Sequence, residues 1–275
     1  MKLKKLLFGL LVGAATLSAP AHSAPILSDI VFVVDESGSM GNVQANLRNN
    51  IGLFANILTG TGQVDARYGL VGYGDINVAP RMVTDFTNAT GFASAASGLV
   101  AFGGTEPGYT ATAFALNELD GQTDLFSFRS NAVKNIIILT DEPSNGDTGT
   151  YGTVGGAAVS ESVLDGLLTS NNALYNGVLS GFGTEASYDD LIADHSGTIF
   201  NLNLFNTTDQ TIVQNFVTDF ANKKLQETLD FCDLNPNDPA CQPNEVPEPG
   251  SLGLLSLALG GLLFKRRRSR LQAVS

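Results

Sequence analysis

The stretch that decides the fold is DIVFVVDESGSMGN, residues 29–42. Its four consecutive apolar residues, 31–34, predict a buried strand. Asp35, Ser37 and Ser39 follow directly, and the glycine between the two serines allows a tight bend. An acid and two hydroxyls at the end of a buried strand suit a turn, a nucleophile or a metal site, and the rest of the chain has to distinguish these three.

The body of the chain alternates between strand-like and helix-like segments. Because strands that alternate with helices form βαβ units, we expect an α/β fold with a doubly wound, mainly parallel sheet and helices on both faces. Residues 81–86 follow the preceding strand closely enough to form a hairpin, which predicts one antiparallel edge strand. The expected strands are 30–34, 68–73, 81–86, 133–140, 174–181 and 197–204, and the expected helices are 43–58, 110–119, 160–168, 187–195 and 211–225.

Three loops at the carboxyl ends of these strands carry oxygen-bearing side chains, and ligands of open α/β sheets bind at this edge. A donor set of carboxylates and hydroxyls, without histidine or cysteine, suits a hard cation such as Mg²⁺ or Mn²⁺ better than Zn²⁺. We therefore predict a site for Mg²⁺, with Mn²⁺ or Ca²⁺ as alternatives. Its residues are Asp35, Ser37, Ser39, Thr105 and Asp141.

The same segments resemble the von Willebrand factor type A domain with its metal-ion-dependent adhesion site. VFVVDESGSM matches the Asp-x-Ser-x-Ser motif, GGT the threonine loop and IIILTDE the aspartate loop. The resemblance covers about residues 28–225 and implies a six-stranded sheet with a short antiparallel strand at an edge. It also implies that three hydroxyls contact the metal and that two carboxylates hold it directly or through water. The hydroxyls are those of Ser37, Ser39 and Thr105, and the carboxylates those of Asp35 and Asp141.

Acidic residues dominate the body of the chain. Of the 15 Lys and Arg, three precede position 6 and five follow position 264, so seven basic residues face 27 acids and the body has a charge near −20. No basic patch exists to displace the counterions of a nucleic acid, so nucleic acid is excluded as a natural partner. Two acids near the predicted site, Asp75 and Glu106, are expected to lie at the surface or behind the ligands, without a ligand role.

The N-terminus has the pattern of a signal peptide. Lys2, Lys4 and Lys5 form a basic region, an apolar core runs from 6 to 17, and small residues follow. We assign residues 1–23 to this peptide and expect the protein to be exported.

The C-terminal segment VPEPGSLGLLSLALGGLLFKRRRS, residues 246–269, resembles the PEP-CTERM sorting tail of Gram-negative bacteria, and we assign residues 247–270 to this tail. Its apolar run, 250–264, would be about 22 Å long as a helix, which is short for a hydrocarbon core of about 30 Å. The basic cluster that follows should stay cytoplasmic. The resemblance implies recognition by an exosortase, a membrane transpeptidase-like enzyme, after transient membrane anchoring, and release to the cell surface or extracellular matrix. An ordinary single-pass anchor is the alternative.

Cys232 and Cys241 lie between the body and this tail. In an oxidising compartment they are expected to close a small disulfide loop, although intermolecular pairing is an open alternative. We assign residues 24–228 to the type A domain and 229–246 to a linker that contains this loop.

An enzyme is not expected. A haloacid dehalogenase-type phosphohydrolase needs a second acid where this chain has Ser37, and a serine hydrolase needs a histidine, of which there are only His22 and His195. We expect an exported binding module whose metal takes an acidic group of a protein or polysaccharide partner. The alternative is a structural envelope or matrix protein whose metal only stabilises the fold, and a metal-dependent phosphohydrolase is a remote one.

Overall fold

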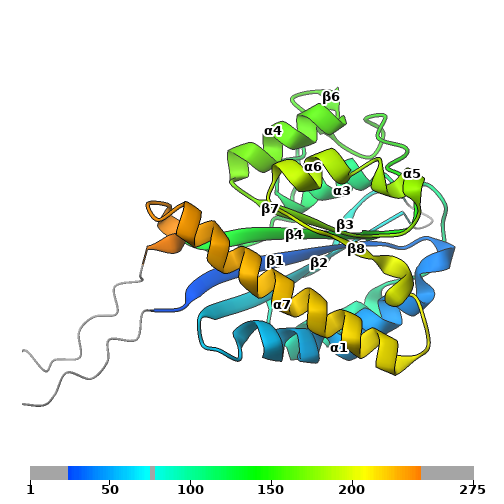
Figure 1. Ribbon diagram of the computed structural model, residues 1–275. Coiled ribbons are helices and arrows are strands. Elements are labelled where there is room, and N and C mark those ends of the chain that lie inside the picture. The colour runs from blue at the N-terminus through cyan, green and yellow to red at the C-terminus, as the bar shows by residue number, and fades with distance from the viewer. Residues whose placement is uncertain (1–23, 75–77, 243–275) are drawn as a thin grey trace, which may run out of the picture. The chain divides into compact units, whose positions relative to one another are not determined.

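Six strands form one sheet in the order β3–β2–β1–β4–β7–β8 (Figure 1). The structure is a computed structural model that describes residues 24–74 and 78–242. All neighbouring strands are parallel except β2 and β3, which are antiparallel at one edge. The predicted α/β fold, with a mainly parallel sheet and one antiparallel edge strand, is therefore confirmed. The strands are β1 (Ile26–Asp35), β2 (Val64–Tyr73), β3 (Arg81–Thr87), β4 (Ala132–Thr140), β7 (Leu174–Leu179) and β8 (Ile199–Asn201).

The two central strands, β1 and β4, are buried on both faces. Successive side chains of β1 enter different cores, with Phe32 and Val34 on one face and Val31 and Val33 on the other. Burial on both faces explains why these apolar runs lack the alternation of a half-exposed strand. The polar segment that follows β1 then lies at the carboxyl edge of the sheet.

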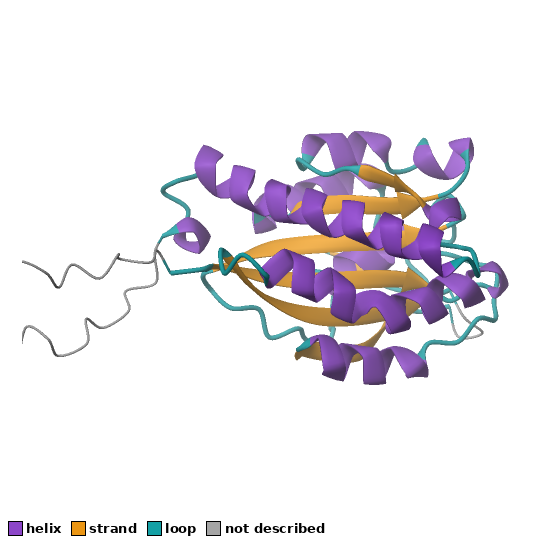
Figure 2. Ribbon diagram, turned by 60° about the horizontal axis from the view of Figure 1, so that its bottom comes forward, coloured by secondary structure: helices purple, strands orange, loops and turns teal. Residues whose placement is uncertain are grey.

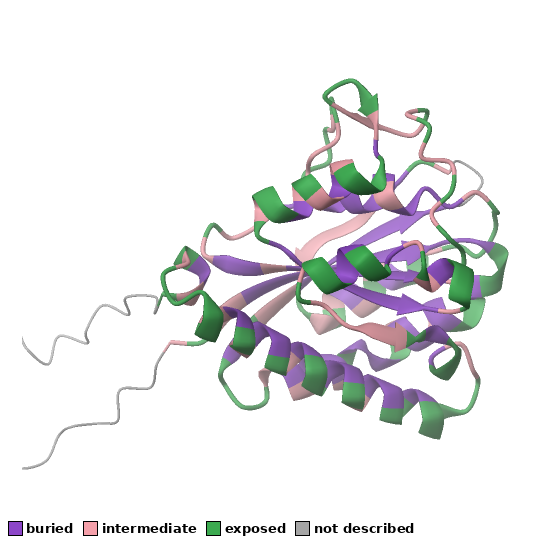
Figure 3. Cartoon of the chain, turned by 45° about the horizontal axis from the view of Figure 1, so that its top comes forward, coloured by how far each residue is buried: buried purple, intermediate pink, exposed green. Residues whose placement is uncertain are grey.

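Helices cover both faces of the sheet, and their buried sides face it (Figures 2 and 3). One core lies under α1, α2 and α7, and the other under α3, α4 and α6. The α-helices are α1 (Gly41–Thr59), α2 (Ala89–Ala95), α3 (Gly108–Ala115), α4 (Glu161–Asn171), α5 (Phe182–Glu185), α6 (Asp189–Asp194) and α7 (Gln210–Leu234). Short 3₁₀ helices are η1 (Gly38–Met40), η2 (Ala96–Gly98), η3 (Leu202–Leu204) and η4 (Pro239–Cys241).

Several elements differ in extent from those expected. The helix predicted over 110–119 ends earlier, because Asn117 takes a left-handed conformation with φ of 67°. The last strand is only three residues long and turns directly into η3. Helix α2 and a two-stranded hairpin, β5 (Thr153–Val154) and β6 (Ala157–Ala158), were not predicted from the sequence.

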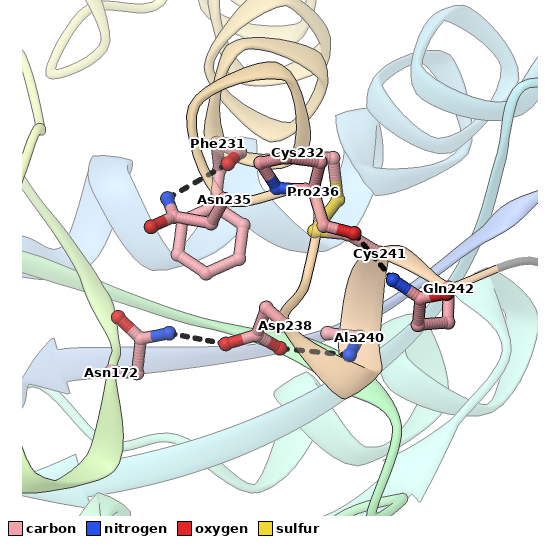
Figure 4. Close-up of a disulfide and its surroundings, with 9 residues drawn as sticks. All are labelled: Asn172, Phe231, Cys232, Asn235, Pro236, Asp238, Ala240, Cys241 and Gln242. Carbon is pink, nitrogen blue, oxygen red and sulfur yellow. Dashed lines mark hydrogen bonds between the residues drawn. A yellow bond between two sulfur atoms is a disulfide. The ribbon is translucent and has the colours of Figure 1, made fainter.

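The C-terminal helix runs past residue 228, where the sequence suggested that the domain ends. Helix α7 continues to Leu234, and Phe231 in its last turns packs with Ala240 of η4 against Val133 and Leu174. Cys232 and Cys241 form a disulfide that ties η4 to α7 (Figure 4). The segment assigned to a linker is thus part of the folded domain as far as residue 242, because it buries apolar side chains there.

A side-chain hydrogen bond also holds the disulfide-closed segment to the domain. Asn172 Nδ2, at the end of α4, donates to Asp238 Oδ2 at 2.6 Å, while Asp238 Oδ1 accepts from the Ala240 backbone N–H at 2.8 Å (Figure 4). Asp238 therefore both caps η4 and fixes its position.

Across 24–74 and 78–242, none of the helices combines the length and apolar character that crossing a bilayer requires. The predicted signal peptide (1–23), the sorting tail (247–270) with its short span (250–264), and Asp75 lie outside the described residues.

Candidate metal site

The loop after β1 holds its acid and hydroxyls in fixed positions. Asp35 is fully buried. Its Oδ1 accepts from the Ser37 backbone N–H at 2.6 Å, and its Oδ2 accepts from Thr140 Oγ1, at the end of β4, at 2.9 Å. The Ser37 and Ser39 hydroxyl oxygens lie 3.2 Å apart. The two serine hydroxyls therefore converge across the tight bend at Gly38.

Glu36, which no sequence motif singled out, binds the loop before α3 to the loop after β1. Glu36 is 1% exposed, and its Oε1 accepts from the Val100 backbone N–H at 2.8 Å and from Arg81 at 2.6 Å. Gln44 of α1 adds two bonds, donating to the carbonyl oxygens of Val100 at 2.6 Å and Asp35 at 3.2 Å. These contacts hold the segment before Thr105 against the loop after β1.

The Thr105 backbone and the Asp35 carboxylate both approach Gly74, which follows β2. A Cβ on Gly74 would lie 3.3 Å from Asp35 Oδ1 and 3.4 Å from the Thr105 carbonyl oxygen. Gly74 also has φ of +85°, which a residue with a side chain rarely adopts. The loops after β1 and before α3 thus meet where only glycine fits.

Asp141 follows β4 directly and brings a third loop to this edge. Its backbone carbonyl accepts from Thr184 Oγ1 at 3.0 Å. Its Oδ1 is buried and has no hydrogen-bond partner among the described residues. A buried carboxylate oxygen is normally paired with a donor or a cation, so this atom is the kind of group that a metal or its bound water would satisfy.

The loops surround a surface depression of about 340 Å³. Glu106, expected at the surface or behind the ligands without a ligand role, is 3% exposed and lines this depression. Its Oε2 accepts from Asn145 Nδ2 at 2.7 Å, and its backbone N–H donates to Asn145 Oδ1 at 3.1 Å. The other lining residues are Ser37, Gly38, Ser39, Gly103, Gly104, Glu142 and Asn145.

The electrostatics of the site favour a bound cation. Burial raises the pKa of Asp35 to about 7, although hydrogen bonds from Ser37 and Thr140 act in the opposite direction. Burial also raises the pKa of Glu106, and the nearby Glu142 and Asp141 add to that rise. A divalent cation would offset the cost of burying these charges, so the residues present fit a metal ion.

Carboxylates alone would not hold a cation at this candidate site. The parts of the chain that the structure describes hold no group of three or more His, Cys, Asp and Glu side chains placed to bind a metal. A cation here would therefore depend on the serine and threonine oxygens, which are ligands that a hard cation accepts.

Comparison with known proteins gives two matches. Residues 29–166 match the model of the von Willebrand factor type A domain, and residues 245–268 match that of the PEP-CTERM protein-sorting motif. The first match runs from β1 to α4 and includes every residue of the candidate metal site. No curated protein matches the chain.

Proposed function

Because this chain belongs to the von Willebrand factor type A domain family and carries a PEP-CTERM protein-sorting motif, we propose that it is a cell-surface module that binds its partner through a divalent cation. The cation is Mg²⁺ by preference, with Mn²⁺ or Ca²⁺ as alternatives. The partner is a protein or polysaccharide that presents a carboxylate.

The observation that carries this proposal is the unpartnered, buried Oδ1 of Asp141 at the edge where the two serine hydroxyls converge. The hydroxyls of Ser37, Ser39 and Thr105 would hold the ion, with Asp35 and Asp141 holding it directly or through water. When bound, the ion supplies an attraction for a carboxylate at an open coordination position.

The residues around the site suit this role. Thr140 and the Ser37 backbone N–H orient Asp35, and the Glu36–Arg81 contact supports the neighbouring loop. The body's charge near −20 repels an anionic partner at long range, but screening limits that repulsion to about 8 Å at physiological salt. Coordination at contact would therefore decide binding.

The sorting motif places this module outside the cell. It marks the protein as exported, processed by an exosortase and sorted to the cell surface. We propose that residues 1–23 direct export as a signal peptide, and that 250–264 anchors the chain in the membrane until processing releases it to the surface or matrix.

A phosphohydrolase is less consistent with the chain. Ser37 stands where that chemistry needs a second acid. Of the described lysines, Lys134 lies in the amino-terminal half of β4, while Lys223 and Lys224 lie on α7. Type A domains are usually interaction modules, and we propose that this one is no enzyme.

The test is capture of surface partners by the purified protein in Mg²⁺ and in EDTA, with Ser37→Ala beside the wild type. Capture that is lost in EDTA and in Ser37→Ala supports the proposal. Equal capture under all conditions would exclude metal-dependent binding. If EDTA and Ser37→Ala lower only the melting temperature, the metal has the purely structural role of the alternative.

A further inference from the structure

A buried polar cluster lies between α7 and the amino-terminal half of β4, away from the carboxyl edge that carries the candidate metal site. Lys224 of α7 and Asn135 of β4 have no exposed surface, and Glu227 is 6% exposed. Lys224 Nζ lies 2.8 Å from Asn135 Oδ1 and 2.9 Å from Glu227 Oε2. The proposed binding function uses none of these three groups.

The cluster combines a nucleophile, an electrophile and a proton acceptor. An amine, a carboxamide and a carboxylate are in hydrogen-bond contact where water is excluded. Burial lowers the pKa of the Lys224 ammonium, although the adjacent Glu227 acts in the opposite direction. Burial thus favours the neutral amine, which is the form that attacks a carbonyl carbon.

We propose that Lys224 and Asn135 become joined by an intramolecular isopeptide bond, with Glu227 as the proton-transfer group. Lys224 Nζ gives a proton to the Glu227 carboxylate and then attacks Asn135 Cγ. The attacking nitrogen loses a second proton to Glu227 as the C–Nδ2 bond of Asn135 breaks, and Glu227 passes both protons in turn to the departing nitrogen, which leaves as ammonium. One C–N bond forms, one C–N bond breaks, and no oxidant or other reactant is needed.

Neighbouring hydroxyls fix the reacting groups. Thr198 Oγ1 donates to Glu227 Oε1 at 2.6 Å, which leaves Oε2 directed to Lys224. Asn135 Nδ2 donates to Ser28 Oγ, itself fully buried, at 2.8 Å, so the amide presents its carbonyl oxygen to the lysine. Well-oriented groups held in this way react with effective concentrations on the order of 10⁵ M or more.

The bond would join two elements that are distant along the chain. Lys224 and Asn135 are 89 positions apart, so the bond would close a long loop and tie α7 to the central strand β4. Reduction of the nearby Cys232–Cys241 disulfide would not release it. A permanent link of this kind suits a domain that is exposed outside the cell.

The test is a peptide map of the full-length purified protein after reduction and digestion at glutamate. Cleavage after Glu118 and Glu161 gives the peptide 119–161, because the bond between Glu142 and Pro143 resists cleavage, and cleavage after Glu185 and Glu227 gives 186–227. We expect one branched peptide that contains both, lighter by one ammonia than their sum. Two separate peptides of unmodified mass would overturn the proposal, and this measurement needs no variant to fold.

Two variants test the roles of the residues. Glu227→Gln should slow bond formation by about a hundredfold or more, so that the two peptides appear separately in freshly purified protein. Lys223→Arg, a change at the exposed neighbouring lysine, should leave the branched peptide intact. A branched peptide of equal yield in Glu227→Gln would exclude Glu227 as the proton-transfer group, and circular dichroism checks that the variant folds.

Discussion

Replacement of Asp35 by asparagine should change the free energy of unfolding in a direction that depends on pH and on the cation. Without a cation, burial raises the pKa of Asp35 from 3.8 to about 7. The folded protein then holds a proton that the unfolded chain releases. The free energy of unfolding therefore falls as pH rises from 3.8 to about 7, and the whole deficit in stability is present above that range. At about 1.4 kcal/mol per pKa unit, the deficit amounts to about 4 kcal/mol.

Asparagine removes this charge and keeps the geometry. The amide Oδ1 can still accept from the Ser37 backbone N–H. The amide Nδ2 can donate to Thr140 Oγ1, because the Thr140 hydroxyl can direct its own proton to the Glu142 carbonyl oxygen, 3.2 Å away. In EDTA near pH 8, Asp35→Asn should therefore be more stable than the wild type by about 2–4 kcal/mol. Near pH 4 the difference should largely disappear, because the wild-type carboxyl is then protonated in the folded state.

Urea unfolding followed by circular dichroism measures these differences, in EDTA and in saturating Mg²⁺. Mg²⁺ should stabilise the wild type but not Asp35→Asn. As a control, Asp190→Asn, at an exposed acid of α6, should change stability by less than about 0.5 kcal/mol in either condition. A lower stability of Asp35→Asn than of the wild type in EDTA near pH 8, or an equal gain of the two proteins from Mg²⁺, would contradict a buried Asp35 charge that the cation offsets.

Three other predictions follow from single features of the structure. Mg²⁺ should bind more weakly in calorimetry as pH falls below about 7, because a proton on Asp35 competes with the ion; an affinity that does not change with pH would contradict this. A Cβ on Gly197 would lie 1.6 Å from a backbone oxygen of β7, so Gly197→Ala should lower the free energy of unfolding by about 3 kcal/mol or more. Gly166→Ala, in α4 with nothing within 4 Å, should instead raise it by about 0.5–1 kcal/mol; equal melting temperatures for the two would be inconsistent with this packing. Replacing both Cys232 and Cys241 by serine should lower the free energy of unfolding by about 2–3 kcal/mol, and an unchanged urea midpoint would count against a stabilising disulfide.

The sheet could be predicted because each strand carries its own pattern. The hairpin predicted at 81–86 matches β3 (Arg81–Thr87) to within one residue. Helix α2 could not be predicted in this way, because it has one large apolar side chain, Phe92, among alanine, glycine, serine and threonine residues. An Asn88 cap begins this helix, and Phe92 packs against Phe32 and Tyr68, which are far away in the sequence.

For the candidate site too, the sequence predicts some features and not others. The sequence indicates which loops carry oxygen ligands, since carboxyl ends of parallel strands share one edge of the sheet. It does not indicate that Glu36 and Glu106 are buried. Each depends on a partner from a distant segment, Arg81 for the first and Asn145 for the second, 45 and 39 positions away. Burial of a carboxylate is decided by such contacts, which no local pattern reveals.

The most direct test of the proposed binding function is a calorimetric titration of Mg²⁺ into the purified protein, Ser39→Ala and Ser162→Ala. Ser162 provides a matched control, because its hydroxyl also lies 3.2 Å from that of a serine two residues away, Ser160, but outside the candidate site. We predict one Mg²⁺ per wild-type molecule, an affinity lower by about tenfold or more in Ser39→Ala, and no change in Ser162→Ala. Absence of binding to the wild type, or equal affinity in Ser39→Ala, would contradict the proposed metal site.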